Sequence, residues 1–351
     1  MAINYASQFA PKVMETFAHE SLTESASGQE FQFSGVKTVK VLTVDTVPLN
    51  DYSRTGSNRY GEPVELGDVT QELTLGDDKS FAMTIDKGNN ADQMNLKGAA
   101  EAMKRQTAQV VVPYIDQYRL KKWAKEAGLV KGYTQTQMES GLLEAIFDAG
   151  AAMDNAGVPL TGRTLFIPNS YYKLLALSDR LVGVDKLGEK ALAKGIVGEV
   201  DGMTVKRVPD NYLPQGVFFL AKWKNATADP VKLQEGKIHK DPPGLSGNLL
   251  EGRVYQDAFV IHTKAEGIYV AANQSLVPSK PAFSYSSGKG ILNCAYTQAK
   301  IYYTLDGSDP RYSETAQLYE SAGFTPVSGA VVKAVAKLEN GFSSEVMEQE
   351  M

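Results

Sequence analysis

The sequence predicts an α+β fold followed by a small all-β module. Apolar residues with helical spacing cover residues 92–127 and 136–157, and the strand-like segments around them do not alternate regularly with helices. After residue 281 only strand-like segments separated by turns remain. The chain has 351 residues, 43% of them hydrophobic and 22% charged, which is the composition of a folded protein with two or three domains.

Residues 1–35 are predicted to form an arm, because their hydrophobic residues are too sparse to close a core. The spacing of Phe9, Val13, Met14 and Phe17 suits one short helix that lies on a neighbouring surface. A frayed terminus is the alternative interpretation.

Residues 36–90 are predicted to form a long projecting β-hairpin with its flanking strands. Residues 36–48 are rich in valine, and residues 50–62 contain many turn-forming residues that are difficult to bury. Two further strand-like segments, Val69 to Leu75 and Phe81 to Ile85, flank Gly76-Asp77-Asp78.

A long helix is predicted over residues 92–127. Pro113 interrupts it, so we expect a kink or two abutting helices near residues 109–113. The face that carries Ile115 is expected to contact the core. Tyr114 and Tyr118 are expected on that same face, and Lys121, Lys122 and Lys125 on another, solvated side.

A second helix is predicted to begin at a Thr136–Glu139 capping box and to end at Gly157. The following segments are predicted to be a strand at 165–167, a helix that is capped at Asn169 or Ser170, and a hairpin at 196–208 with an Asp201-Gly202 turn. Further strands are expected at 218–220, 254–262 and 267–271.

The C-terminal region is predicted to be a compact β-sandwich behind a linker at Pro278–Pro281. Its strand-like segments are 291–295, 301–305 and 331–337. The linker suggests a separable module that assembly does not require.

No residue pattern supports a catalytic, cofactor-binding or metal site, so no residue is nominated for any of them, no cofactor is expected, and the protein is predicted not to be an enzyme. The three histidines, His19, His239 and His262, are far apart in the sequence, and Cys294 is the only cysteine. The single cysteine fits synthesis in a cytoplasm, and no segment resembles a secretion signal or a membrane span. The net charge of −5 disfavours tight DNA binding.

Five stretches of residues 1–277 form a recognisable order: Gly35–Val41 leading into Asp51–Arg54, Phe81–Asp86, Val112–Arg119, Gly195–Val205 with Val208-Pro209 and Leu213-Pro214, and Gly252–Val260 with Gly267-Ile268-Tyr269. In this shared order they resemble tailed-phage major capsid proteins with the Hong Kong 97-type fold. In such a protein the helix side that carries Lys121, Lys122 and Lys125 is expected to be solvated or to face DNA. The resemblance implies an N-terminal arm at 1–35, an extended loop with flanking strands at 36–90, a peripheral domain with a spine helix at 91–160 and 250–277, and an axial domain at 161–249.

Residues 278–351 resemble the immunoglobulin-like modules that are appended to chitobiases, through Ile301-Tyr302-Tyr303-Thr304-Leu305-Asp306-Gly307-Ser308-Asp309-Pro310. In this motif a strand ends in an Asx-type turn, so it indicates a fold and not a binding activity. On a shell, such a module is expected to be an exposed decoration that contacts surface glycans.

The resemblance implies a major capsid protein that self-assembles, as hexamers and pentamers, into an icosahedral shell around double-stranded DNA without sequence-specific binding. Implied partners are a portal, decoration proteins and a separate scaffolding protein, unless the short arm suffices for assembly. The implied location is the virion capsid, assembled in the host bacterial cytoplasm, with no membrane contact. The alternatives are an encapsulin-like compartment shell and, as a lesser one, a carbohydrate-binding or carbohydrate-acting protein.

Overall fold

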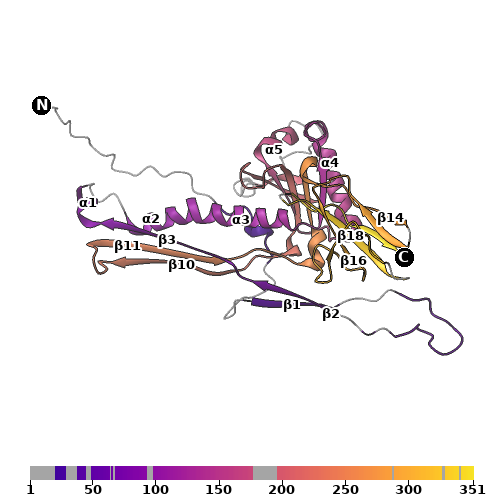
Figure 1. Cartoon of the computed structure of the whole chain (residues 1–351). Coiled ribbons are helices and arrows are strands. Elements are labelled where there is room, and N and C mark those ends of the chain that lie inside the picture. Colours follow the sequence, from indigo (N-terminus) through magenta and orange to yellow (C-terminus); the bar gives the residue numbers. More distant parts are fainter. Residues whose placement is uncertain are drawn as a thin grey trace.

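The structure of the chain is a computed structural model. It describes residues 20–28, 38–44, 49–63, 65, 68–92, 98–176, 196–286, 288–325, 329–339 and 341–351. The apolar residues Phe9, Val13, Met14 and Phe17 of the expected arm lie outside these ranges. Figure 1 shows a body built around one large sheet, a long helix with a narrow sheet that extends from the body, and a hairpin loop that projects in another direction.

A six-stranded mixed sheet forms the centre of the body, in the order β4-β13-β8-β5-β7-β6. Its strands are β4 (Leu129–Tyr133), β13 (Ile268–Asn273), β8 (Val217–Trp223), β5 (Arg163–Pro168), β7 (Met203–Val208) and β6 (Ile196–Val200). Every residue of β5 is buried. Successive side chains of a strand point to opposite faces, and in β5 Phe166 joins one hydrophobic cluster while Leu165 and Ile167 join the other. The sheet is therefore covered on both faces.

Two helices cover these faces. α3 (Val112–Lys125) places Leu120 and Trp123 in the cluster that contains Phe166. α4 (Gln135–Asn155) packs on the opposite face through Met138, Leu142, Ile146 and Met153. The helical period of the apolar residues in 136–157 therefore predicted a real core face.

The capping box of α4 lies two residues before the predicted one. Thr134 is the N-cap, and its hydroxyl accepts a hydrogen bond from the backbone N–H of Gln137. Thr134-x-x-Gln137 and Thr136-x-x-Glu139 both satisfy the sequence pattern, but β4 ends at Tyr133, so the helix begins at once. The choice of Thr136 was wrong for this reason.

The long helix has the predicted interruption. α2 (Ala99–Gln106) continues through a π-helical turn at Thr107–Val111 into α3, and Pro113 lies in the first turn of α3. Because the backbone before Pro113 is already helical, the proline removes one helical hydrogen bond and crowds the carbonyl of the preceding turn, and the π-helical turn lies where this disruption is expected. The helix starts at Ala99 and not at residue 92, after the short helix α1 (Lys87–Asp92).

A narrow three-stranded sheet lies along the long helix, in the order β10-β11-β3. Its strands are β10 (Val231–Lys240), β11 (Gly247–Gln256) and β3 (Asp77–Asp86). Phe81 of this sheet packs with Val111 and Ile115 of the helix. The helix and the sheet form the extension to the left of the body in Figure 1.

The projecting hairpin exists, but its strands differ from those predicted. β1 (Thr38–Val44) pairs antiparallel with β2 (Asp68–Thr74), whereas β3 pairs with β11. The strands on either side of Gly76, β2 and β3, therefore do not pair with each other, and each pairs with a strand from another part of the sequence.

The smaller elements follow the predictions more closely. β6 and β7 form the predicted hairpin, and Asp201 (φ 51°) and Gly202 (φ 69°) have the positive φ values that a two-residue turn of this kind requires. α5 (Asn169–Ala176) follows β5. β9 (Thr227–Ala228) and β12 (Phe259–Val260) form a short bridge between segments.

The C-terminal module has two sheets around its own core. One sheet has the order β17-β16-β18-β19 and the other consists of β14 and β15. The strands are β14 (Ala282–Ser286), β15 (Lys289–Asn293), β16 (Lys300–Thr304), β17 (Gln317–Leu318), β18 (Val331–Lys337) and β19 (Met347–Glu350). Leu292 from one sheet and Val332 from the other share a hydrophobic cluster. This is the immunoglobulin-like arrangement expected from the sequence.

The division of residues 36–277 into extended loop, peripheral and axial domains stays a prediction. The pairings place β10, from the range expected for the axial domain, beside β11 and β3. β4, from the range expected for the peripheral domain, pairs with β13 in the six-stranded sheet. α4, from the same range, packs on a face of this sheet.

Candidate assembly surface

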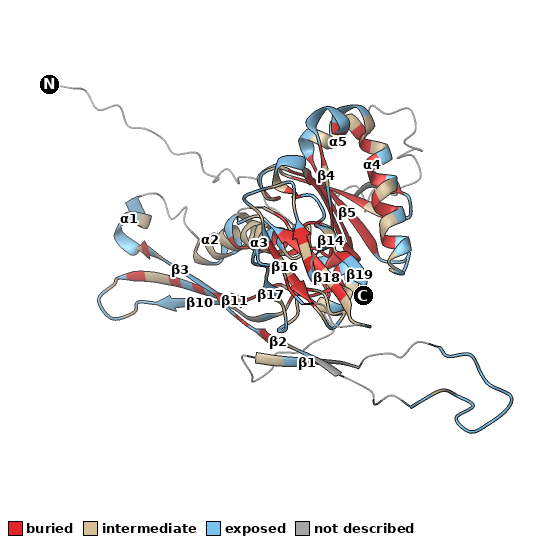
Figure 2. Ribbon diagram, turned by 45° about the vertical axis from the view of Figure 1, so that its right-hand side comes forward, coloured by how far each residue is buried: buried red, intermediate tan, exposed pale blue. Residues whose placement is uncertain are grey.

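Residues 49–63 form a projecting loop at the end of the β1–β2 hairpin, and the large apolar side chains of this loop are exposed to solvent. Leu49 is 101% exposed and Tyr60 is 85% exposed. The rings of Tyr52 and Tyr60 meet edge to face, with their centroids 5.1 Å apart. Figure 2 shows this loop as an exposed segment that extends well beyond the body. Exposed apolar and aromatic side chains gathered on one segment are typical of a contact surface.

The tip of this loop has a defined backbone. Gly56, Asn58 and Gly61 have positive φ values, of 88°, 57° and 85°. The N–H of Ser53 donates to the carbonyl of Arg59 over 3.0 Å, which joins the two sides of the tip. Glycine and asparagine are the residues that adopt this conformation at low cost, so the sequence encodes the turns themselves.

The base of the hairpin is held by two carboxylates. The hydroxyl of Tyr114 donates to Asp77 over 2.7 Å, and the hydroxyl of Tyr118 donates to Asp257 over 2.8 Å. The backbone N–H of Gly76, between β2 and β3, also donates to Asp257. Burial and these hydrogen bonds to carboxylates raise the pKa of both tyrosines, so they stay protonated donors at neutral pH.

Strand β2 is fastened to the body through one glutamine. The side-chain amide of Gln71 donates to the carbonyl of Val260 over 2.9 Å, and its oxygen accepts from the backbone N–H of His262 over 3.0 Å. Leu73, in the same strand, is buried with Val41 and Ala228. The hairpin therefore projects from an anchored base.

Residues 20–28 lie against the body and are held by Asp116 of α3. Its carboxylate accepts four hydrogen bonds, from the hydroxyls of Ser21 and Thr23 and from the backbone N–H groups of Leu22 and Thr23, at 2.6–3.2 Å. Asp116 is buried, and a buried carboxylate needs such donors to offset its lost hydration.

Two buried lysines also hold this segment. Lys206 donates to the carbonyl of Leu22 over 2.6 Å, and Lys222 donates to the carbonyl of Ala26 over 2.5 Å. Burial lowers the pKa of Lys222 to about 8, and its ammonium group lies 4.4 Å from the ring centroid of Trp123. Neither lysine was singled out from the sequence, because each lies in a strand whose other residues determine the pattern.

The histidines remain apart. His239 lies 3.1 Å from Glu251 on the narrow sheet, His262 lies beside Tyr312, and His19 lies outside the described residues. In the described part of the chain, no group of three or more His, Cys, Asp or Glu side chains is placed to hold a metal ion. None of the helices described is long and apolar enough to cross a membrane.

The C-terminal module matches a known family model. Residues 281–348 match the model described as the chitobiase/beta-hexosaminidase C-terminal domain. No curated protein matches the chain.

The body resembles solved phage structures. A chain from Mycobacterium phage Che8 has a TM-score of 0.60 and 18% sequence identity, and the match covers 78% of this chain and 99% of that one. A chain from the capsid structure of the cyanophage P-SCSP1u has a TM-score of 0.60 and 16% identity, with 77% and 93% covered. A chain from the asymmetric unit of the bacteriophage PhiM1 mature capsid has a TM-score of 0.57 and 13% identity, with 78% and 93% covered. The chain therefore has the Hong Kong 97-type fold of tailed-phage capsid structures, followed by an immunoglobulin-like module of the chitobiase C-terminal type.

Proposed function

We propose that this chain is the major capsid protein of a tailed bacteriophage, which self-assembles into an icosahedral shell around double-stranded DNA. The observation that carries the proposal is that the base of the hairpin is fixed to the body while the large side chains at its far end are exposed to solvent. Gln71 and Leu73 fix the base to the body, while Leu49 and Tyr60 at the other end are exposed. Such a tip is suited to contact another copy of the chain.

The assembly mechanism in this proposal is repeated weak contact. One loop that reaches over one neighbour buries too little surface to hold a stable dimer. In a closed lattice every subunit both gives and receives such a contact, so the later contacts form at high effective concentration. Hexamers and pentamers are the arrangements that such a lattice would use.

The charge of the chain suits a container. The net charge of −5 gives little attraction to DNA, so a shell of these subunits would enclose the polymer without gripping it. The proposed role is structural and includes no catalytic step. Assembly in the host cytoplasm, with a portal and with scaffolding and decoration proteins, belongs to the same proposal.

We place the module on the outer surface of the shell. A folded module on every subunit would take volume from the genome if it pointed inward. Its surface offers Tyr285, which is 61% exposed, and an aromatic ring of this kind is suited to glycan contact. Repetition over the lattice would make weak glycan contacts effective.

Negative-stain electron microscopy of the purified full chain tests the proposed function. We expect hollow particles of uniform size, with a sedimentation coefficient far above that of a monomer. A chain that stays monomeric at all concentrations, alone and with its scaffolding protein, would contradict the proposal.

A further inference from the structure

The turn at residues 306–313 of the module is held by several hydrogen bonds of its own. The carboxylate of Asp306 accepts a hydrogen bond from the backbone N–H of Ser308 over 3.0 Å and another from the hydroxyl of Thr315 over 2.7 Å. The N–H groups of Tyr312 and Ser313 both donate to the carbonyl of Asp309. The turn motif therefore presents the residues that follow it in a fixed direction.

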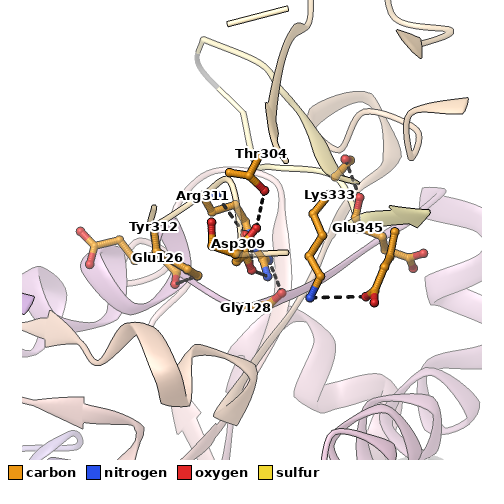
Figure 3. Close-up of polar contacts among 11 residues, drawn as sticks. Glu126, Gly128, Thr304, Asp309, Arg311, Tyr312, Lys333 and Glu345 are labelled. Carbon is orange, nitrogen blue, oxygen red and sulfur yellow. Dashed lines mark hydrogen bonds and ion pairs between the residues drawn. The ribbon is translucent and has the colours of Figure 1, made fainter. Parts of the chain in front are cut away.

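Arg311 of this turn reaches the end of the long helix. Its side chain is 8% exposed, and Asp309 holds its guanidinium through paired contacts of 3.0 and 2.6 Å. The free edge of the guanidinium donates to the backbone carbonyl of Gly128, three residues after the end of α3 (Figure 3). Gly128 lies between the end of α3 and the start of β4, so this hydrogen bond ties the module to the segment that directly follows the helix.

Tyr312 makes the second contact with the same helix end. Its hydroxyl donates to the backbone carbonyl of Glu126 over 3.1 Å (Figure 3). Its ring stacks on the ring of His262, with the centroids 4.6 Å apart. The backbone N–H of His262 donates to Gln71 of β2, so a continuous line of contacts runs from the module to the hairpin base.

The hydrophobic cores of the module and the body are also joined. Phe342 of the module is buried in the cluster that contains Trp123 and Val270 of the body. Its backbone N–H donates to the carbonyl of Leu276 over 2.9 Å, and the hydroxyl of Tyr296 donates to the carbonyl of Gln274 over 3.0 Å. Contacts of this kind are not those of a domain that swings freely on a linker.

We propose that the C-terminal module is a built-in brace. It docks through Arg311 and Tyr312 and thereby stabilises the end of the long helix. Through the contact of Tyr312 with His262, it also stabilises the base of the projecting hairpin. This surface takes the chain's own body as its partner. The inference concerns the single subunit and does not rest on the shell function. It replaces the separable module that the Pro278–Pro281 linker suggests with one that is docked.

The test is amide hydrogen exchange and thermal unfolding of the free full-length chain. In the double variant Arg311→Ala/Tyr312→Ala, we expect exchange at residues 126–128 and 262–267 to become at least about tenfold faster. The melting temperature should fall by roughly 4 °C or more. Tyr285→Ala, which removes an exposed ring of the same module, is the matched control and should change neither quantity.

If the double variant does not fold, Tyr312→Phe is measured in its place. It keeps the stacking on His262 and removes only the hydrogen bond to Glu126. We then expect at least about threefold faster exchange near residue 126, confined to the docked segments. Exchange and melting temperature equal to those of the wild type, in whichever of these variants folds, would overturn the brace.

Discussion

Asp116 and Lys222 are charged side chains in the interior of the body, and both hold residues 20–28. Asp116 accepts hydrogen bonds from Ser21 and its neighbours, and Lys222 donates to the carbonyl of Ala26. A charge in a helix or strand pattern is normally assigned to the solvent side, because isolated buried charges are costly. Here the partners come from a segment about 90 to 200 residues away, which no local pattern can indicate.

Asp116→Ala is predicted to release residues 20–28 from the body. The half-buried hydroxyl of Ser21 and the buried hydroxyl of Thr23 lose their acceptor, so we expect the free energy of unfolding to fall by roughly 2–4 kcal/mol. Limited proteolysis and hydrogen exchange should show the segment open. Glu24→Ala removes an exposed carboxylate from the same segment and should leave it docked; equal protection in both variants would contradict this role of Asp116.

Lys222 predicts a pH dependence of stability. Burial lowers its pKa in the folded protein from 10.5 to about 8, so between these values unfolding takes up a proton. In this pH window Lys222 therefore makes the free energy of unfolding rise with pH. The destabilisation that comes from burying the charged lysine is fully present below about pH 8. Compared with Lys222→Met, the wild type should gain stability from pH 8 to 10. Parallel profiles from chemical denaturation of the two proteins would rule this out.

Ile115→Asp is predicted to prevent folding of the subunit. Ile115 is buried between Val111 of the helix and Val254 of the narrow sheet, and a carboxylate there has no hydrogen-bond partner to offset its desolvation. The free energy of unfolding should fall by about 4 kcal/mol or more. The protein should therefore be insoluble or melt without a cooperative transition. Lys121→Asp, on the exposed side of the same helix, should fold; a soluble and assembling Ile115→Asp protein would show that the buried face is misassigned.

At the scale of elements, the sequence predicted what local chemistry determines. Pro113 marks the irregular helix near residues 107–113, and Asp201-Gly202 marks a hairpin turn. The pairing of β2 was not predictable in this way. Its partner β1 lies across the projecting loop, and β3 pairs with β11, more than 160 residues away. Strand partners depend on contacts that are distant in sequence, whereas turns and caps depend on neighbours.

The projecting loop carries a prediction for assembly. Tyr52→Ala/Tyr60→Ala removes two exposed rings, so the free energy of unfolding of the subunit should change by less than about 0.5 kcal/mol. The yield of particles should fall at least about tenfold, because each lattice contact weakens and the effect repeats over the shell. Tyr285→Ala, which removes an exposed ring elsewhere in the chain, is the control. Size-exclusion chromatography with electron microscopy measures the yield, and normal particles from the double variant would remove the loop from the assembly surface.

At the scale of the whole molecule, the resemblance to capsid proteins predicted the architecture better than the individual patterns did. Each motif alone indicates a helix or a turn, but their order matches one fold, and three solved phage structures resemble this chain with TM-scores of 0.57–0.60. The docking of the module was missed, because Arg311 and Tyr312 lie in a turn motif that looks self-contained in the sequence. The Pro278–Pro281 linker indicates where the module is joined to the body. Whether the module docks on the body depends on side chains that lie far from this linker in the sequence.

A cryo-electron microscopy reconstruction of assembled particles tests the central claim most directly. We expect a closed icosahedral shell in which residues 49–63 of each subunit lie on the body of a neighbouring subunit, with Tyr52 and Tyr60 buried in that contact. A shell whose subunits meet through other surfaces while residues 49–63 extend into solvent would contradict the account, and so would a preparation that forms no closed shell.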